Sequence, residues 1–133
     1  MELHLRDKHI LITGGSKGIG LACADAFLQE GARVSLVSRD PSNLKRALER
    51  LASYGSDRIQ IQAADLTNPA AALDAFQAAQ KGFGPVDVLV NSAGAAKRTP
   101  APNLTPQAWQ DAMQAKFLSY VYMIGQCLCS PGH

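Results

Sequence analysis

A glycine-rich segment between an apolar run and a helical pattern restricts the fold of this chain more than any other feature. Residues 13–20 read Thr-Gly-Gly-Ser-Lys-Gly-Ile-Gly and directly follow Ile-Leu-Ile at positions 10–12. Glycine permits backbone conformations that other residues avoid, and the amino end of a helix offers unpaired N–H groups to an anion. The segment predicts a strand, a turn and a helix that together bind a phosphate, with a purely structural turn as the alternative.

The helix after this turn is expected to end at Gly31, because glycine commonly stops a helix. Apolar side chains recur before it at spacings of three and four residues, which is typical of a helix that buries one face. The residues expected on that face are Ile19, Cys23, Ala26 and Phe27.

The alternation of a short apolar run with a helical pattern continues along the chain. Further strands are predicted over residues 34–37, 59–63 and 86–90. Such repeated strand-helix units are typical of an α/β fold with a parallel sheet. The length suits one domain, so residues 1–133 are expected to form a single unit.

Three later helices are predicted to begin at a capping side chain followed by proline, a frequent pattern in the first helical turn. The three pairs are Asp40-Pro41, Asn68-Pro69 and Thr105-Pro106. The last helix is expected to be long and to run from Pro106 to about Leu128. Its aromatic residues Trp109, Phe117 and Tyr120 are interpreted as core or interface residues rather than a binding motif.

The order of the glycines resembles that of a known enzyme family. Thr13-Gly14-x-x-x-Gly18-x-Gly20 is similar to the glycine motif of the short-chain dehydrogenase/reductase family. Asp65-Leu66 resembles the family's adenine-contacting pair, and Asn91-Ser92-Ala93-Gly94 resembles its N-N-A-G element, with Ser92 in place of Asn. The resemblance implies a doubly wound Rossmann fold that exchanges a hydride between a nicotinamide and a carbonyl or alcohol substrate.

The residues after the second strand indicate which nicotinamide cofactor is used. An acidic residue there accepts hydrogen bonds from the ribose hydroxyls of NAD and would repel a 2′-phosphate. This chain has Ser38 and Arg39 instead, and a guanidinium can hold a phosphate through two charge-assisted hydrogen bonds. With Lys17 as a second cation, NADP(H) is predicted over NAD(H); the alternative is that both are solvated surface charges.

The motifs together give a set of candidate cofactor-binding residues. Asp65 could instead cap the next helix, and Asn91 could satisfy backbone groups at a strand end. The full set is Gly14, Ser16, Lys17, Gly18, Ile19, Gly20, Ser38, Arg39, Asp65, Leu66, Asn91, Ala93 and Gly94.

The residues that would carry out hydride-transfer chemistry are not found. Catalysis in the family is implied to use a Ser and a Tyr in a Y-x-x-x-K helix. The three tyrosines are instead followed four residues later by Arg58, Ile124 and Gln126. We therefore expect a Rossmann sheet truncated after the fourth strand and the following long helix, with no catalytic residue present.

Composition excludes several other classes of protein. The chain is 47% hydrophobic and 18% charged with a net charge of +2, which fits a globular protein without a basic nucleic-acid surface. No signal peptide or membrane span is expected, and an odd count of three cysteines favours reduced thiols in the cytoplasm. A metal site is not expected, because Cys127 and Cys129 are too closely spaced for zinc.

Three functional hypotheses remain open at this point. The first is an NADP(H)-dependent oxidoreductase present as a truncated chain, the second a non-catalytic NADP(H)-binding module or regulatory subunit. The third is a pseudogene product without a stable fold. A truncated sheet exposes an apolar edge and helix face, so we also expect a homo-oligomer in which a second copy covers them.

Overall fold

The computed structural model describes residues 3–92 and 100–129. Its centre is a parallel sheet of four strands in the order β3-β2-β1-β4. The strands are β1 (His9–Thr13), β2 (Arg33–Ser38), β3 (Ile59–Ala63) and β4 (Val88–Asn91). The chain therefore moves outward from β1 to β3 and then returns to the opposite side of β1. The carboxyl ends of β1 and β4 form the switch point at which such sheets bind ligands.

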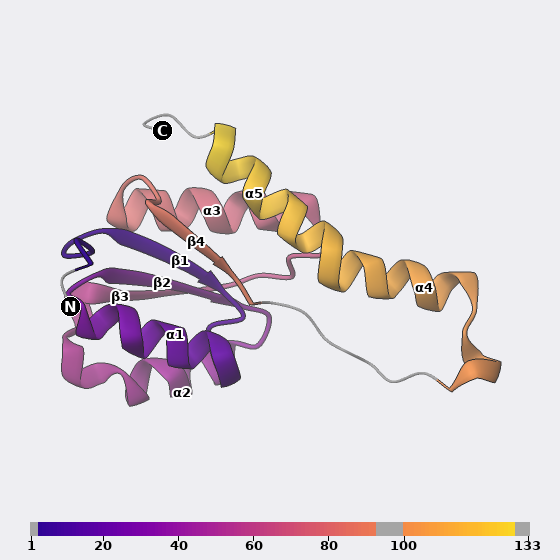
Figure 1. The fold of residues 1–133 in the computed structure, drawn as a ribbon, viewed down its shortest axis with the longest axis horizontal. Helices are drawn as coiled ribbons and strands as arrows, with labels where there is room; N and C mark the ends of the chain where they lie inside the picture. Colours follow the sequence, from indigo (N-terminus) through magenta and orange to yellow (C-terminus); the bar gives the residue numbers. More distant parts are fainter. Residues whose placement is uncertain (1–2, 93–99, 130–133) are drawn as a thin grey trace.

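Helices cover both faces of this sheet, with α1 and α2 on one face and α3 and α5 on the other (Figure 1). They are α1 (Gly18–Gln29), α2 (Pro41–Arg50), α3 (Pro69–Phe83), α4 (Pro106–Met113) and α5 (Ser119–Cys129). Shorter segments are the 3-10 turns η1 (Ala52–Tyr54), η2 (Ser56–Arg58) and η3 (Ala101–Asn103) and the π-helical η4 (Gln114–Leu118). The predicted doubly wound parallel sheet is confirmed.

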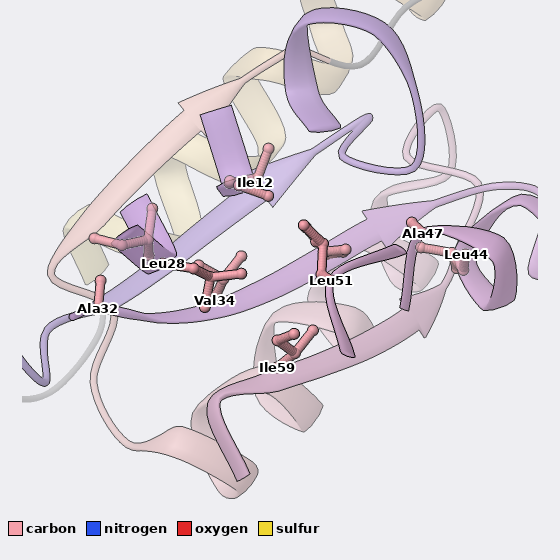
Figure 2. Packing of buried hydrophobic residues seen from close by; sticks show 11 residues of the cluster. Ile12, Leu28, Ala32, Val34, Leu44, Ala47, Leu51 and Ile59 are labelled. Carbon is pink, nitrogen blue, oxygen red and sulfur yellow. The ribbon is translucent and has the colours of Figure 1, made fainter. Parts of the chain in front are cut away.

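The two faces of the sheet carry separate hydrophobic clusters. Ile10 and Ile12 of β1 point toward α1 and α2, while Leu11 points to the other face, as successive strand residues must. Figure 2 shows the first cluster, where Val34 packs with Leu28 of α1 and Leu51 after α2. Burial on both faces explains why the strands read as continuous apolar runs rather than alternating ones.

The buried face of α1 differs from the predicted one. The buried residues are Gly20, Ala24 and Leu28, and Cys23 and Phe27 pack beside them. Ile19 is 77% exposed in the first turn, and Ala26 is exposed as well. The small residues Gly20 and Ala24 allow the helix to approach the sheet closely, so the contacting face is rotated relative to the purely apolar pattern.

The predicted long helical segment runs from Pro106 to Cys129, but it is not a single continuous α-helix. A π-helical turn, η4, separates α4 from α5, and such turns contain an extra residue. The Gln114 side chain at its start donates to the carbonyl oxygen of Thr67 over 2.7 Å and to the Tyr122 hydroxyl over 3.2 Å. These bonds tie the irregular turn to the end of the sheet, and beyond it Ser119 and Met123 are buried.

The outward side of the same helical segment carries large exposed apolar side chains, which we call the apolar stripe. Trp109 is 61% exposed and Phe117 is 55% exposed. The stripe consists of Trp109, Met113, Phe117, Val121, Ile124 and Leu128. Within the part of the chain that the structure describes, no helix is both long and apolar enough to cross a bilayer.

Candidate functional site

A cavity of about 570 Å³ opens at the carboxyl ends of the strands, a size typical of small-molecule sites. Its lining comes from the segments that follow β1, β2, β3 and β4 and from the start of α5. The lining residues are Gly14, Ser16, Lys17, Ile19, Val37, Ser38, Arg39, Asp40, Asn43, Ala64, Asp65, Leu66, Thr67, Ser92 and Ser119. Eight residues predicted from the sequence to bind the cofactor are therefore brought together here.

The glycine segment forms a tight loop between β1 and α1. Gly14 has φ of 70° and Gly18 has φ of 61°, conformations that side chains disfavour. The Gly14 N–H donates to the carbonyl oxygen of Val37 over 2.7 Å, which fixes the loop against β2. A Cβ atom on Gly20 would lie 2.8 Å from the carbonyl carbon of Gly14, so only glycine lets α1 start this close to the loop.

The amino end of α1 differs from those of α2, α3 and α4. The side chains of Asp40, Asn68 and Thr105 cap α2, α3 and α4 by accepting backbone hydrogen bonds. Lys17, at the same position before α1, makes no such cap, and the first turn of α1 has no acidic residue. The first N–H groups of a helix have no partner inside it, so α1 presents uncapped donors beside the cavity.

Two hydroxyl groups connect the glycine loop to the end of β2. Ser16 is buried, and its hydroxyl donates to the hydroxyl of Ser38 over 3.0 Å. Arg39 follows Ser38 and is exposed at the cavity, as is Lys17. No carboxylate in residues 3–92 and 100–129 lies within salt-bridge distance of the Arg39 guanidinium. The two cations are thus free to interact with an anionic ligand.

Asp65 lies on the cavity wall in a turn after β3. Its Oδ1 atom accepts from the Thr67 hydroxyl over 2.6 Å and from the Thr67 backbone N–H over 3.0 Å. These two hydrogen bonds, with a smaller contribution from the charge of Arg39, hold the pKa of Asp65 below its usual value. The carboxylate is therefore ionised and fixed in position, and it does not cap α3, a role that belongs to Asn68.

The end of β4 closes the cavity on the side of the switch point. The Ser92 N–H donates to the backbone oxygen of Thr13 over 3.1 Å, which joins β4 to β1 beyond the last sheet pair. The buried Oδ1 of Asn91 has no partner among the described residues. Ala93 and Gly94, also predicted to bind the cofactor, lie outside the described residues.

Several cavity residues were not found from the sequence. Asn43 and Thr67 follow Arg39 and Asp65 within a few positions, so placing each loop at the carboxyl edge could have identified them. Ser119 carried no such signal, because it lies far along the chain at the start of α5, directly after the π-helical turn. Three predicted residues are sequence neighbours of lining residues but do not line the cavity themselves: Gly18, Gly20 and Asn91.

The sequence and fold were compared with those of known proteins. The sequence profile described as short chain dehydrogenase matches residues 8–130, which is nearly the whole chain. The chain belongs to the short chain dehydrogenase family. The cavity is thus the part of a short chain dehydrogenase fold that lies at the strand ends, around the glycine loop.

Individual relatives agree with this assignment. An uncharacterised oxidoreductase of Bacillus subtilis, YvrD, is 36% identical over 121 residues, covering 91% of this chain and 45% of its own length. An NADP-dependent (R)-specific alcohol dehydrogenase of Lentilactobacillus kefiri is 34% identical over 110 residues. The aligned part covers 83% of this chain and 43% of the length of that enzyme. The chain spans about half the length of these curated relatives.

A solved short chain dehydrogenase has the same arrangement of strands and helices. The glucose/ribitol dehydrogenase of Brucella melitensis superposes with a TM-score of 0.86 at 28% identity, over 96% of this chain and 54% of that one. The described residues contain no group of three or more His, Cys, Asp or Glu that could hold a metal.

Proposed function

We propose that the cavity binds NADP(H) and that residues 1–133 act as the nicotinamide-dinucleotide-binding domain of a short-chain oxidoreductase. The observation that carries this proposal is the uncapped amino end of α1 beside the Gly14–Gly18 loop, whereas side chains cap α2, α3 and α4. An oxidoreductase of this family draws its hydride acceptor or donor, the nicotinamide ring, from this cofactor.

Several groups around the cavity support binding of the pyrophosphate and the adenine of such a cofactor. The loop and the α1 N–H groups suit the pyrophosphate, and Gly18 has open space where a Cβ would stand. Asp65 and Leu66 suit the adenine, and the exposed Ile19 offers an apolar surface. Asn91, at the end of β4, is proposed to contact the cofactor as well, and so are Ala93 and Gly94, which follow it in the sequence and lie outside the described residues.

The preference for the phosphorylated cofactor rests on the end of β2. Ser38 leaves no carboxylate to accept the ribose 2′-hydroxyl, and Arg39 and Lys17 are cations exposed at the cavity. A guanidinium binds a phosphate through two parallel hydrogen bonds. One relative is named as NADP-dependent, which agrees with this proposal.

Titration of the purified chain with NADPH and with NADH tests the proposal directly. We expect the chain to bind NADPH more tightly than NADH. Arg39→Ala should weaken the binding of NADPH by roughly 10- to 100-fold and leave the affinity for NADH nearly unchanged. Arg50→Ala, which removes an exposed charge at the far end of α2, is the matched control. Tighter binding of NADH would refute the role of Arg39, and binding of neither cofactor would refute the site.

A second function, cofactor binding without turnover, is favoured by the tyrosines of the chain. None of Tyr54, Tyr120 and Tyr122 is followed four residues later by lysine, so the Y-x-x-x-K helix is not in this sequence. Carbonyl substrates should therefore be turned over only by a protein that adds such a helix. NADPH oxidation by the 133-residue chain with a carbonyl substrate would contradict this.

We further propose that a second copy of the chain covers the apolar stripe. Six large side chains on one side of α4, η4 and α5 are exposed, and burying one such side chain contributes about 1.5–3 kcal/mol. We also propose a cytoplasmic location, because Cys23 and Cys127, two of the three cysteines, are free thiols in the part of the chain that the structure describes.

A further inference from the structure

The charges that line the cavity do not uniformly favour an anion. Lys17 and Arg39 bring two positive charges, and Asp40 and Asp65 bring two negative ones. Asp65 is part of the proposed adenine site and is fixed by Thr67. Asp40 has no role in the proposed function, although it is the residue next to Arg39.

Asp40 lines the cavity, and its carboxylate is held in place by the start of α2. Its Oδ1 atom accepts from the Ser42 N–H over 2.8 Å and from the Asn43 N–H over 3.4 Å. The following Pro41 fixes the first turn of the helix, and Asn43 itself lines the cavity. Asp40 therefore cannot turn away from the cavity without giving up the cap of α2.

The charge of Asp40 is only partly compensated by its surroundings. In the described residues the salt bridge within 4.0 Å joins Arg58 and Asp7, so no lysine or arginine pairs with Asp40. The amino end of α2 contributes a partial positive charge, which is smaller than the full charge of a carboxylate. A dianionic phosphate held by Arg39 would therefore be repelled by the neighbouring carboxylate.

We propose that Asp40 determines cofactor specificity by reducing the preference for NADP(H) that Arg39 and Lys17 create. This inference rests on the proposed function, because it concerns the same subsite. NAD(H) has only a hydroxyl at the 2′-position and is not repelled, so Asp40 narrows the difference in affinity between the two cofactors.

Substitutions that keep the cap and remove the charge test this proposal. Asn and Ser cap helices about as well as Asp, so Asp40→Asn and Asp40→Ser should fold normally. We expect both to bind NADPH about three- to tenfold more tightly than the wild type, with NADH changed by less than about twofold. The gain should shrink at high ionic strength, because salt screens exposed charges.

Two further variants separate the effect of the negative charge of Asp40 from the effect of its capping of α2. Glu49→Gln removes one negative charge from the exposed far end of α2 and should leave the ratio of the two affinities unchanged. Asp40→Ala removes the cap as well, so it should show the same change in ratio together with a lower melting temperature.

The outcomes of these titrations test the role of Asp40 separately from the proposal that the cavity binds NADP(H). If the wild type binds neither cofactor, the proposed function fails and the role of Asp40 fails with it. If the wild type binds both and Asp40→Asn leaves the ratio unchanged, only the role of Asp40 is refuted. A change in ratio caused entirely by weaker NADH binding would also refute it, because Asp40 would then hold the ribose instead of repelling a phosphate.

Discussion

The Nε2 atom of His9 lies 2.6 Å from the hydroxyl of Ser35, inside the sheet on the face covered by α3. The other ring nitrogen, Nδ1, lies 2.9 Å from the carbonyl oxygen of Gly84 and must donate to it. In the neutral tautomer with the proton on Nδ1, Nε2 accepts from the Ser35 hydroxyl, which itself accepts from the Gln60 side chain over 2.7 Å. Burial favours this neutral form of the imidazole, and the network lies at the end of the strands opposite the cavity.

The network predicts that the chain is less stable in acid. Burial is the main cause that lowers the pKa of His9 below 6.5, and the charge of Arg33 adds to it. The hydrogen bond to Gly84 and the charge of Asp87 oppose the shift. Since the folded state disfavours the proton, the contribution of His9 to stability is complete above pH 6.5 and is lost as the pH falls below it.

Urea unfolding between pH 8 and pH 5 measures this effect. His9→Gln should be less stable than the wild type at neutral pH and should show a flatter dependence in the acid range. His4→Gln, which changes an exposed histidine, should keep the slope of the wild type. An equal slope in His9→Gln would show that another group is responsible.

Gly20→Ala should damage the glycine loop. The added Cβ would stand 2.8 Å from the carbonyl carbon of Gly14, so α1 or the loop must move. We expect a loss of about 1–3 kcal/mol in unfolding free energy and at least tenfold weaker NADPH binding, measured by urea unfolding and titration.

Gly125→Ala provides a matched control for this substitution. Gly125 is also helical, and a Cβ there meets no atom within 4 Å. Alanine should leave cofactor binding unchanged and increase the free energy of unfolding by up to about 1 kcal/mol, because alanine has a higher helix propensity than glycine. Similar losses in both variants would contradict the steric explanation.

Phe117→Glu should weaken self-association through the apolar stripe. Phe117 is near the middle of the stripe and is 55% exposed, so a charge there would be buried at a contact between copies. Sedimentation velocity over a range of concentrations should show a dimer dissociation constant raised by at least about tenfold. Gln110→Glu, an exposed change on α4, should have little effect, and a monomeric wild type would refute the interface.

The sequence allowed most of the fold to be predicted because local signals agreed with the final packing. Asp40, Asn68 and Thr105 cap the helices that their pairing with proline indicated. The fourth strand was predicted to begin at Val86, but it begins at Val88, since Asp87 bonds to the His9 backbone ahead of the first sheet pair.

Features decided by contacts between distant residues could not be predicted in this way. The π-helical turn depends on the bond from Gln114 to Thr67, which are far apart in the sequence. The apolar spacing of α1 placed Ile19 on the buried face, whereas the approach of Gly20 to Gly14 rotates the helix and exposes Ile19. The capping role of Asp40 was predicted, but its place on the cavity wall required the structure.

The position of β4 beside β1 also has a consequence for the order in which the sheet assembles. Ile10 pairs with Val88, so the side of β1 that does not face β2 is paired only with a strand from much later in the chain. Pairings between nearby segments close more readily than distant ones. During synthesis on the ribosome β1, β2 and β3 can pair first, while the other side of β1 stays open until β4 has emerged. That open side is where a nascent chain of this kind is most exposed to wrong pairing.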